Sequence, residues 1–323
     1  MAPRPYNLMW IVMTEMKKDS KKYLGMLALL LVTIIWGGGF VASNIALESL
    51  TPFRILFFRF LIASVIMAVP AAQKRKSIKR CDLTGGALLG TALFGGFALQ
   101  IIGLQYTTAS KNAFLTATNV VMVPILAFVF GRKKILPRSI IGALTALLGA
   151  GILSLQPGFV IGKGDALTLL CAVCFAAQIY LTGRYVNAID PAILNFMQML
   201  TAFLLSTIGL VTTGGIALHP SIRSMAAVLY LGAVSTSICY FLQTWAQKYV
   251  DETGSAIILS MESVFGTVFS IIILHEEVTM RMVIGSVLIL GAVVISQLGG
   301  DPEKKSRDKD EMRSERKSQR PSD

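Results

Sequence analysis

Long apolar runs alternate with short polar segments along almost the whole chain. About 20 apolar residues let a helix cross the roughly 30 Å of hydrocarbon in a bilayer, and in lipid the backbone groups of such a run must bond internally. The period-2 alternation of a membrane β-barrel is absent from the sequence. The pattern therefore predicts an all-α integral membrane protein. We expect ten transmembrane helices, at residues 23–47, 53–70, 84–104, 109–130, 139–155, 164–184, 192–211, 224–246, 254–274 and 280–298.

Composition supports the membrane prediction and argues against nucleic acid as a partner. Hydrophobic residues make up 54% of the 323 residues and charged residues 15%, against about 25% charged residues in a soluble protein. The formal net charge of +12 could indicate nucleic acid, but the basic residues stand at the ends of apolar runs, where they determine membrane topology. The expected partners are the lipid bilayer and a small-molecule substrate, and a possible homodimer stays open.

The basic residues are divided unevenly between the two sides of the membrane. Most of the 30 Lys and Arg residues lie on the side that holds both chain ends, and Arg59 lies inside a span. The opposite side holds Arg54, Lys111, Lys163, Arg223 and Arg281. Because the side rich in Lys and Arg faces the cytoplasm, we expect a multi-pass protein of the plasma (inner) membrane with both termini cytoplasmic. Residues 1–22 are the expected N-terminal cytoplasmic segment, and the polar tail 299–323 is expected to be disordered.

The two halves of the chain align with each other. Residues 97–153 lie over residues 240–296 without a gap. The alignment pairs Leu99 with Leu242, Gln100 with Gln243, Tyr106 with Tyr249, Gly142 with Gly285 and Ile152 with Ile295. We therefore expect two inverted five-helix repeats, 23–155 and 164–298, because an odd number of spans per half turns the second half over. Inverted repeats with a binding site near the bilayer midplane are typical of transporters; the alternative is two unrelated runs of five helices.

Charged residues inside the expected spans are few, and each suggests a functional role because burial of a charge in lipid is costly. Glu262 lies near the middle of the ninth span, and its repeat counterpart is Asn119 in the fourth. Glu262 could exchange a proton during transport or contact the substrate; the alternative is a structural acid paired with a fixed donor. Arg59, in the second span, is its expected partner, and could instead bind a substrate carboxylate bidentately.

Other polar and aromatic residues recur at helical spacing on single faces of the spans. Such stripes predict a central cavity with hydrogen-bonding groups and aromatic walls, although any one residue could simply bond to a neighbouring helix. The candidate substrate-binding residues are Trp36, Asn44, Arg59, Gln100, Asn112, Asn119, Gln178, Tyr240, Gln243 and Glu262. Glu262 is also the candidate proton-coupling residue.

The sequence carries no recognisable motif for enzymatic or metal chemistry. Gly37-Gly38-Gly39 lacks the Gly-Lys pair of a phosphate loop and lies in a span, so we predict a role in close helix packing or as a hinge. Cys171 and Cys174 stand inside an apolar helix, and neither of the two His residues has a second ligand candidate nearby, so we expect no metal and no cofactor. A membrane enzyme would need clustered His, Asp or Glu at one membrane face, so we expect that the protein is not an enzyme.

Several short segments occur in a characteristic order along both halves. They are Trp36-Gly37, Asn44, Pro52 and Arg59; Thr108-Ala109-Ser110, Pro124 and the stretch from Gly142 to Gly151; and, in the second half, Met261-Glu262-Ser263-Val264-Phe265 and Leu274-His275-Glu276-Glu277-Val278-Thr279. In these segments the chain resembles the drug/metabolite transporter (DMT) superfamily, EamA-type. It departs at Gly131-Arg132-Lys133, where the family commonly has Gly-Glu-Arg, and at Ser263, where Pro is common. The resemblance implies transport of metabolites such as amino acids, often outward, by alternating access.

The expected function is secondary transport of a small amino-acid-like or drug-like metabolite across the plasma membrane, with export as the expected direction. A facilitative exchanger of anionic metabolites ranks lower, because it would need several inward-facing basic residues and only Arg59 qualifies. A non-catalytic membrane interaction protein is the other alternative, and it leaves Glu262 and the polar faces without a role.

Overall fold

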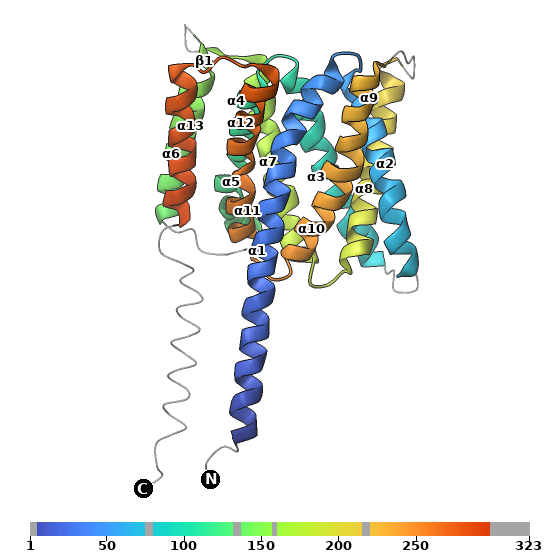
Figure 1. Cartoon of the computed structure of the whole chain (residues 1–323), viewed down its shortest axis with the longest axis vertical. Helices are drawn as coiled ribbons and strands as arrows, with labels where there is room; N and C mark the ends of the chain where they lie inside the picture. The colour runs from blue at the N-terminus through green and yellow to red at the C-terminus, as the bar shows by residue number, and fades with distance from the viewer. Residues whose placement is uncertain (1–4, 75–79, 132–136, 157–159, 215–219, 298–323) are drawn as a thin grey trace.

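The computed structural model describes residues 5–74, 80–131, 137–156, 160–214 and 220–297. Helices dominate these ranges (Figure 1). They are α1 (Pro5–Leu47), α2 (Pro52–Gln73), α3 (Arg80–Leu104), α4 (Ala109–Ala117), α5 (Asn119–Gly131), α6 (Pro137–Ser154), α7 (Lys163–Tyr185), α8 (Pro191–Thr212), α9 (Ile222–Leu229), the π-helix η2 (Tyr230–Ile238), α10 (Cys239–Ala246), α11 (Glu252–Ser260), α12 (Glu262–Leu274) and α13 (Met280–Gln297). Two-residue antiparallel strands, β1 (Leu155–Gln156) and β2 (Val160–Ile161), join α6 to α7.

Within the described ranges, eight helical segments are long and apolar enough to cross a membrane. They are Ser20–Leu47, Pro52–Gln73, Asp82–Leu104, Ala109–Gly131, Lys163–Tyr185, Pro191–Thr212, Ile222–Ala246 and Glu252–Leu274. They correspond to eight of the ten spans predicted from hydropathy. Helices α6 and α13 lie where the fifth and tenth spans were expected. The apolar part of α13, Met280–Ala292, is shorter than the eight segments above.

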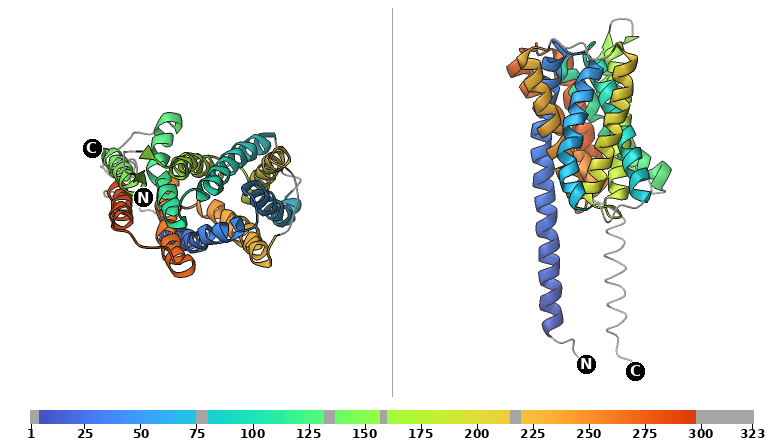
Figure 2. Two further views of the ribbon diagram at one scale, coloured as in Figure 1. Left: turned by 90° about the horizontal axis from the view of Figure 1, so that it is seen from above. Right: turned by 90° about the vertical axis from the view of Figure 1, so that its right-hand side faces the viewer.

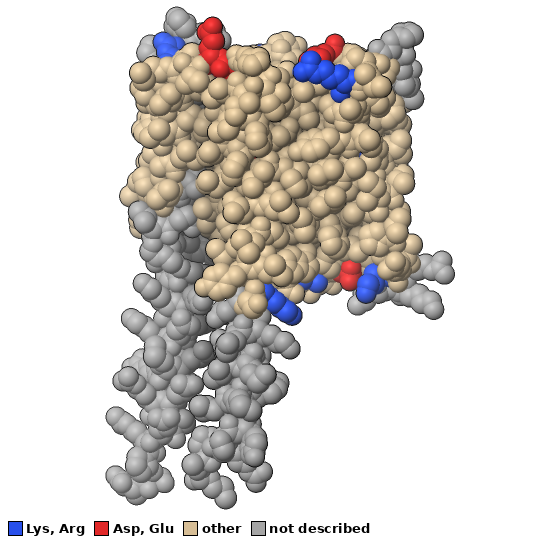
Figure 3. All heavy atoms as spheres, viewed as in Figure 1, with Lys and Arg blue, Asp and Glu red and all other residues tan. Residues whose placement is uncertain are grey.

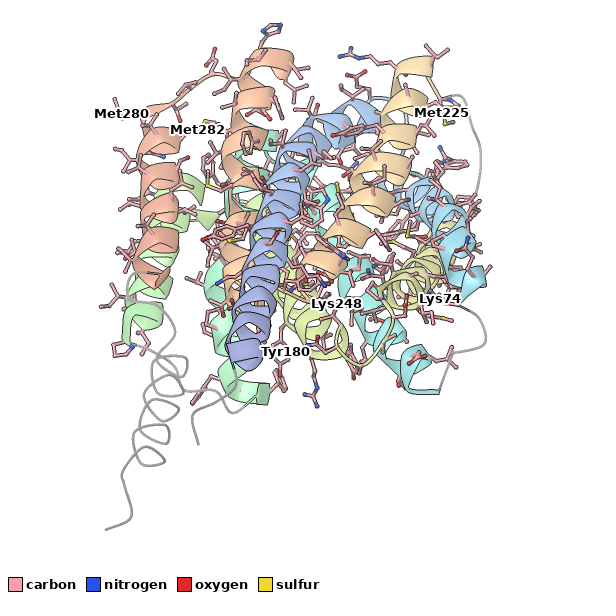
Figure 4. All side chains as sticks on the ribbon, turned by 60° about the horizontal axis from the view of Figure 1, so that its bottom comes forward. Lys74, Tyr180, Met225, Lys248, Met280 and Met282 are labelled. Atoms are coloured by element: carbon pink, nitrogen blue, oxygen red, sulfur yellow. The ribbon has the colours of Figure 1, made fainter. Side chains whose placement is uncertain are left out.

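On the face shown in Figure 3, the Lys, Arg, Asp and Glu side chains of the described residues lie at the two ends of the bundle, with a belt free of these charged residues between them. Figure 4 labels Lys74 and Lys248 at the end from which α1 projects, here called the lower face, and Met225 and Met280 at the opposite, upper face. Helices α6 and α13 pack against each other, at one end of the elongated bundle (Figure 2). Such a belt is what a helix bundle in a bilayer must present to lipid.

Two spans are interrupted near their centres. Thr118 separates α4 from α5 with φ −62° and ψ −13°, and Met261 separates α11 from α12 with φ −62° and ψ −14°. At both places the N–H bonds to the carbonyl three residues back, to Leu115 O at 3.2 Å and to Ile258 O at 3.1 Å. Hydroxyl groups that bond back to helix carbonyls compete with the regular ladder, as Thr118 Oγ1 does with Leu115 O at 2.6 Å.

The two interrupted spans run in opposite directions. In Figure 1, α4 lies above α5 whereas α12 lies above α11, so the chain descends through α4 and α5 and ascends through α11 and α12. Helix α4 packs against α12, and α5 packs against α11. The two interruptions therefore lie where an upper helix pair meets a lower one.

Glycines let α1 approach α12 and η2 closely. A Cβ atom added to Gly37 would lie 2.6 Å from Phe265 Cβ and 2.8 Å from the Gly266 nitrogen, and one added to Gly38 would lie 2.9 Å from the Tyr230 hydroxyl. The close-packing role predicted for Gly37-Gly38-Gly39 is confirmed. This approach brings α1 and α12 together beside the centre of the bundle.

Candidate functional site

A small cavity lies among the helices near the two interruptions. Its volume is about 40 Å³, room for roughly three water molecules. The lining residues come from both halves of the chain: Trp36, Gly39, Phe40, Ser43, Arg59, Phe97, Gln100, Asn119, Phe175, Gln178, Ile179, Ser235, Tyr240, Leu259 and Glu262. A polar cavity enclosed by membrane-spanning helices is where substrate and ion pathways are built.

Two polar side chains mark the points where the interrupted spans meet the cavity. Asn119 opens α5 and Glu262 opens α12, and they are only 4% and 6% exposed. Among the described residues, Glu262 has neither an ion-pair nor a hydrogen-bond partner, and Asn119 Oδ1 has no donor. Buried polar groups are normally satisfied, so both side chains present unused bonding capacity to the cavity.

Arg59 is buried beside the same cavity, at 2% exposure. Its Nε donates to Thr236 Oγ1 at 2.6 Å and its Nη2 donates to Ser235 Oγ at 3.4 Å. The guanidinium carbon lies 3.6 Å from the ring centroid of Phe97, a favourable cation–π geometry. These neutral partners hold the group but leave its positive charge uncompensated.

The expected pairing of Arg59 with Glu262 is wrong. Both residues lie in the described part of the chain, and no ion pair joins them. The physical reason is the π-helix η2, which brings the hydroxyls of Ser235 and Thr236 to the guanidinium. The alternative, a structural acid with a fixed donor at Glu262, loses its proposed donor for the same reason.

Aromatic rings form one wall of the cavity. Trp36 Nε1 donates to Ser235 O at 2.7 Å, and the Trp36 and Tyr240 rings lie 4.9 Å apart. The Phe97 ring lies 5.0 Å from Phe175 and 6.1 Å from Tyr240. These separations are typical of favourable aromatic pairs, so the wall is a connected apolar surface next to the Arg59 guanidinium and the Glu262 carboxyl group.

Seven of the ten candidate residues line the cavity: Trp36, Arg59, Gln100, Asn119, Gln178, Tyr240 and Glu262. Three do not. Asn112 donates to Thr168 Oγ1 at 2.9 Å and to Gln100 O at 3.2 Å, and Gln243 donates to Gln178 Oε1 at 3.3 Å. Both therefore brace lining residues through interhelical hydrogen bonds. Asn44 is half-buried on α1 and lies outside the cavity lining.

Side-chain amides continue from the cavity towards the lower face. Gln178 Nε2 donates to Gln198 Oε1 at 3.3 Å, and Gln198 Nε2 donates to Asn195 Oδ1 at 2.6 Å. On the upper side lies an apolar cluster of Phe40, Leu104, Ala109 and Ala113.

Some lining residues were not singled out from the sequence. Ser235 belongs to the hydroxyl run Ser235-Thr236-Ser237 within the apolar eighth span, a signal that could have been found. Phe175 and Ile179 flank Gln178 at helical spacing, but their side chains are common in any helix core. Among the described residues, no three His, Cys, Asp or Glu side chains lie close enough together to hold a metal ion.

A helix bundle of this kind, with a polar and aromatic cavity within its spans, defines a class of membrane transport proteins. Residues 23–155 and 162–297 both match the sequence model of the EamA-like transporter family. The chain therefore belongs to the EamA-like transporter family, within the drug/metabolite transporter superfamily.

Relatives from distant organisms include a protein named as a transporter. An uncharacterized transporter of Archaeoglobus fulgidus is 34% identical over 279 residues, which cover 86% of this chain and 87% of that protein. A WAT1-related protein of Arabidopsis thaliana is 25% identical, over 71% of this chain and 70% of that protein. A solved crystal structure aligns with a TM-score of 0.64 at 17% identity, covering 85% of this chain and 97% of the other; this likeness shows the fold alone.

Proposed function

We propose that the protein is a secondary transporter that moves a small amino-acid-like metabolite across the plasma membrane by alternating access, in the direction of export. The observation that carries this proposal is the presence of Arg59 and Glu262 in one buried cavity with no ion pair between them. A buried guanidinium without a counter-ion is costly, and so is a buried carboxyl group without a donor. A ligand with a carboxylate for Arg59 and an ammonium group for Glu262 would relieve both costs.

The lining favours a zwitterion with an apolar body. Arg59 keeps N–H groups that can bind a carboxylate bidentately, and the Glu262 carboxyl can accept from an ammonium group. The wall of Trp36, Phe97 and Tyr240 suits an apolar side chain. A cationic drug-like solute is the second candidate, favoured by Glu262 and the same wall. Exchange of polyanionic metabolites is disfavoured because Arg59 is the only basic residue among the described lining residues.

Glu262 is the proposed proton-coupling residue. A carboxyl group in a water-poor cavity can hold either a proton or a substrate ammonium group, but it gains little from holding both. Proton binding and substrate binding at one carboxyl would therefore exclude each other. A proton moving inward would then drive a substrate outward, which is the exchange that export requires.

We further propose ten spans in two inverted repeats, with α6 and α13 as the fifth and tenth and with both termini cytoplasmic. Three observations support it: two separate family matches, the opposite directions of the interrupted spans, and their matching interruptions at Thr118 and Met261. Repeats of this kind rock about a central site in many transporters.

Cysteine labelling tests the topology. In a background with the four native cysteines replaced by Ser, we expect single cysteines at Lys74 and Lys248 to be labelled only from the cytoplasmic side. Cysteines at Met225 and Met280 should be labelled only from outside (Figure 4). Cytoplasmic labelling at Met280 together with outside labelling at Met225 would contradict the inverted arrangement.

A ligand series tests the substrate class. The purified protein is heated with each of the twenty amino acids, and with the amine and the carboxylic acid that correspond to each one. A ligand at 100 times its Kd stabilises the folded state by about 2.7 kcal/mol, which a melting curve resolves. We expect at least one amino acid to stabilise the protein more than its amine and its acid do. Equal stabilisation by the amine would favour the cationic solute, and no stabilisation by any amino acid would contradict the zwitterion.

A further inference from the structure

The π-helix η2 lies directly against Arg59. A Cβ atom added to Gly232, in the first turn of η2, would lie 3.0 Å from the Arg59 carbonyl oxygen. One turn later, Ser235 and Thr236 direct their hydroxyls at the guanidinium. In the repeat alignment, α3 occupies the place of α9, η2 and α10, and α3 is a continuous α-helix. π-Helical segments are rare and frequently lie at functional sites.

The two hydroxyls occupy one particular edge of the guanidinium. Arginine presents five N–H groups in a planar fork. Thr236 accepts from Nε at 2.6 Å and Ser235 accepts from Nη2 at 3.4 Å, so the Nε–Nη2 edge is taken. Phe97 covers one face, with the guanidinium carbon 3.6 Å from its ring centroid. The edge formed by Nη1 and Nη2 remains, and it is the end-on edge that binds a carboxylate with two parallel bonds.

The same segment also orients the aromatic wall. Ser235 contributes its backbone carbonyl oxygen to Trp36 Nε1 at 2.7 Å as well as its hydroxyl to Arg59. Tyr240, whose ring lies 4.9 Å from that of Trp36, follows η2 by two residues. Trp36 of α1 and Arg59 of α2 are therefore both hydrogen-bonded to η2, and the Trp36 ring in turn packs against Tyr240.

We infer that Thr236 is a positioning residue that holds Arg59 with its Nη1–Nη2 edge towards the cavity, and so selects substrates that carry a carboxylate. This inference rests on the proposed function, because it assumes that Arg59 meets a substrate anion. Without the Thr236 hydroxyl, Nε loses its acceptor and the guanidinium can turn about its stem. Binding would then have to order the side chain again, which weakens affinity.

The test compares Thr236→Val, which keeps the shape but removes the hydroxyl, with Thr236→Ser, which keeps the hydroxyl. Thr244→Val is the matched control, because Thr244 is a buried threonine of α10 whose hydroxyl bonds to Tyr240 O within its own helix at 2.7 Å. Dissociation constants are measured for the full-length protein with the amino acid that stabilises it most and with the corresponding amine.

We expect Thr236→Val to weaken amino-acid binding by roughly tenfold, the effect of a lost hydrogen bond to a charged group, and to change amine binding less than about twofold. Thr236→Ser should restore most of the amino-acid affinity, and Thr244→Val should resemble the wild type. Equal weakening for amino acid and amine, or no weakening for either, would overturn the positioning role. The wild-type protein is judged first: if it binds the amine as well as the amino acid, the zwitterion proposal fails, and this inference fails with it. A wild-type preference for the amino acid that Thr236→Val leaves unchanged overturns this inference alone.

Discussion

The two interrupted spans, α4–α5 and α11–α12, share a geometry but differ in chemistry. Both break with nearly identical dihedral angles, at Thr118 and at Met261, and both place the next residue at the cavity. In the first span that residue is Asn119, a neutral amide; in the second it is Glu262, a carboxyl group. The comparison teaches that two spans with the same backbone break can present different chemistry to the cavity, and we propose that this one difference in side chain supplies the coupling. Each prediction below separates these two contributions.

The largest effect is expected for Glu262→Gln. Glutamine has nearly the same shape, but it cannot take up or release a proton and carries no charge for a substrate ammonium group. We expect transport in proteoliposomes to fall roughly 10- to 100-fold, the worth of a charged hydrogen bond, and its pH dependence to disappear. Glu277→Gln, at an exposed residue after α12, is the control. Full transport with unchanged pH dependence in Glu262→Gln would show that Glu262 does not couple transport to proton movement.

The next largest effect is expected where α1 packs closely against α12, the upper helix of the second interrupted span. A Cβ atom at Gly37 would lie 2.6 Å from Phe265 Cβ on α12, so Gly37→Ala must push α1 away from α12. Overpacking of this kind costs about 1–3 kcal/mol, and we expect a lower melting temperature in detergent. Gly291→Ala is the matched control, since an added Cβ there has nothing within 4 Å. If the two variants melt alike, the close contact between α1 and α12 is not important for stability.

A smaller effect is expected for Asn119→Ala. The amide is neutral and its loss removes hydrogen-bonding capacity worth about 0.5–1.5 kcal/mol, which corresponds to a two- to tenfold fall in substrate affinity. The pH dependence should be retained because Glu262 is intact. Loss of pH dependence in this variant would mean that the two interruptions contribute equally to coupling, and the comparison above would break down.

The smallest effect is expected where the two spans begin. Helix α4 has its N-terminus bound by a residue of the other half: Glu276 accepts from Ala109 N at 2.8 Å. Both helices also have a local cap: Thr108 accepts from Lys111 N at 3.3 Å in α4, and Asp251 accepts from Gly254 N at 3.1 Å in α11. Removal of a cap costs about 0.5–2 kcal/mol, so Glu276→Ala should lower the free energy of unfolding by about 1 kcal/mol. Glu277→Ala should have no effect, and equal destabilisation by both would remove Glu276 from this role.

Much of the fold could be predicted because a span needs only length and apolar composition. Glu262 and Asn119 could also be placed, since polar residues in the middle of a span rarely face lipid. Asn44, Asn112 and Gln243 were expected at the cavity but do not line it. A row of polar residues along one helix face extends beyond the part of that face that a small cavity meets. Asn112 and Gln243 bind neighbouring helices instead.

The partners of Arg59 could not be predicted for a different reason. They depend on η2, where a change from α- to π-helix turns Ser235 and Thr236 towards the guanidinium. Hydropathy does not distinguish a π-helix from an α-helix, and the contact also needs α2 to pack beside the eighth predicted span. The periodicity of apolar residues along the sequence carries no information on such contacts between helices.

The central claim is that proton and substrate movement are coupled at Glu262, and proton flux tests it most directly. Proteoliposomes with wild-type protein are loaded with the amino acid that binds best and with a pH-sensitive dye, then diluted into amino-acid-free buffer. The account predicts that exit of the amino acid acidifies the interior through the wild type and does not do so through Glu262→Gln. Exit of the amino acid through the wild type with no change of internal pH would contradict it.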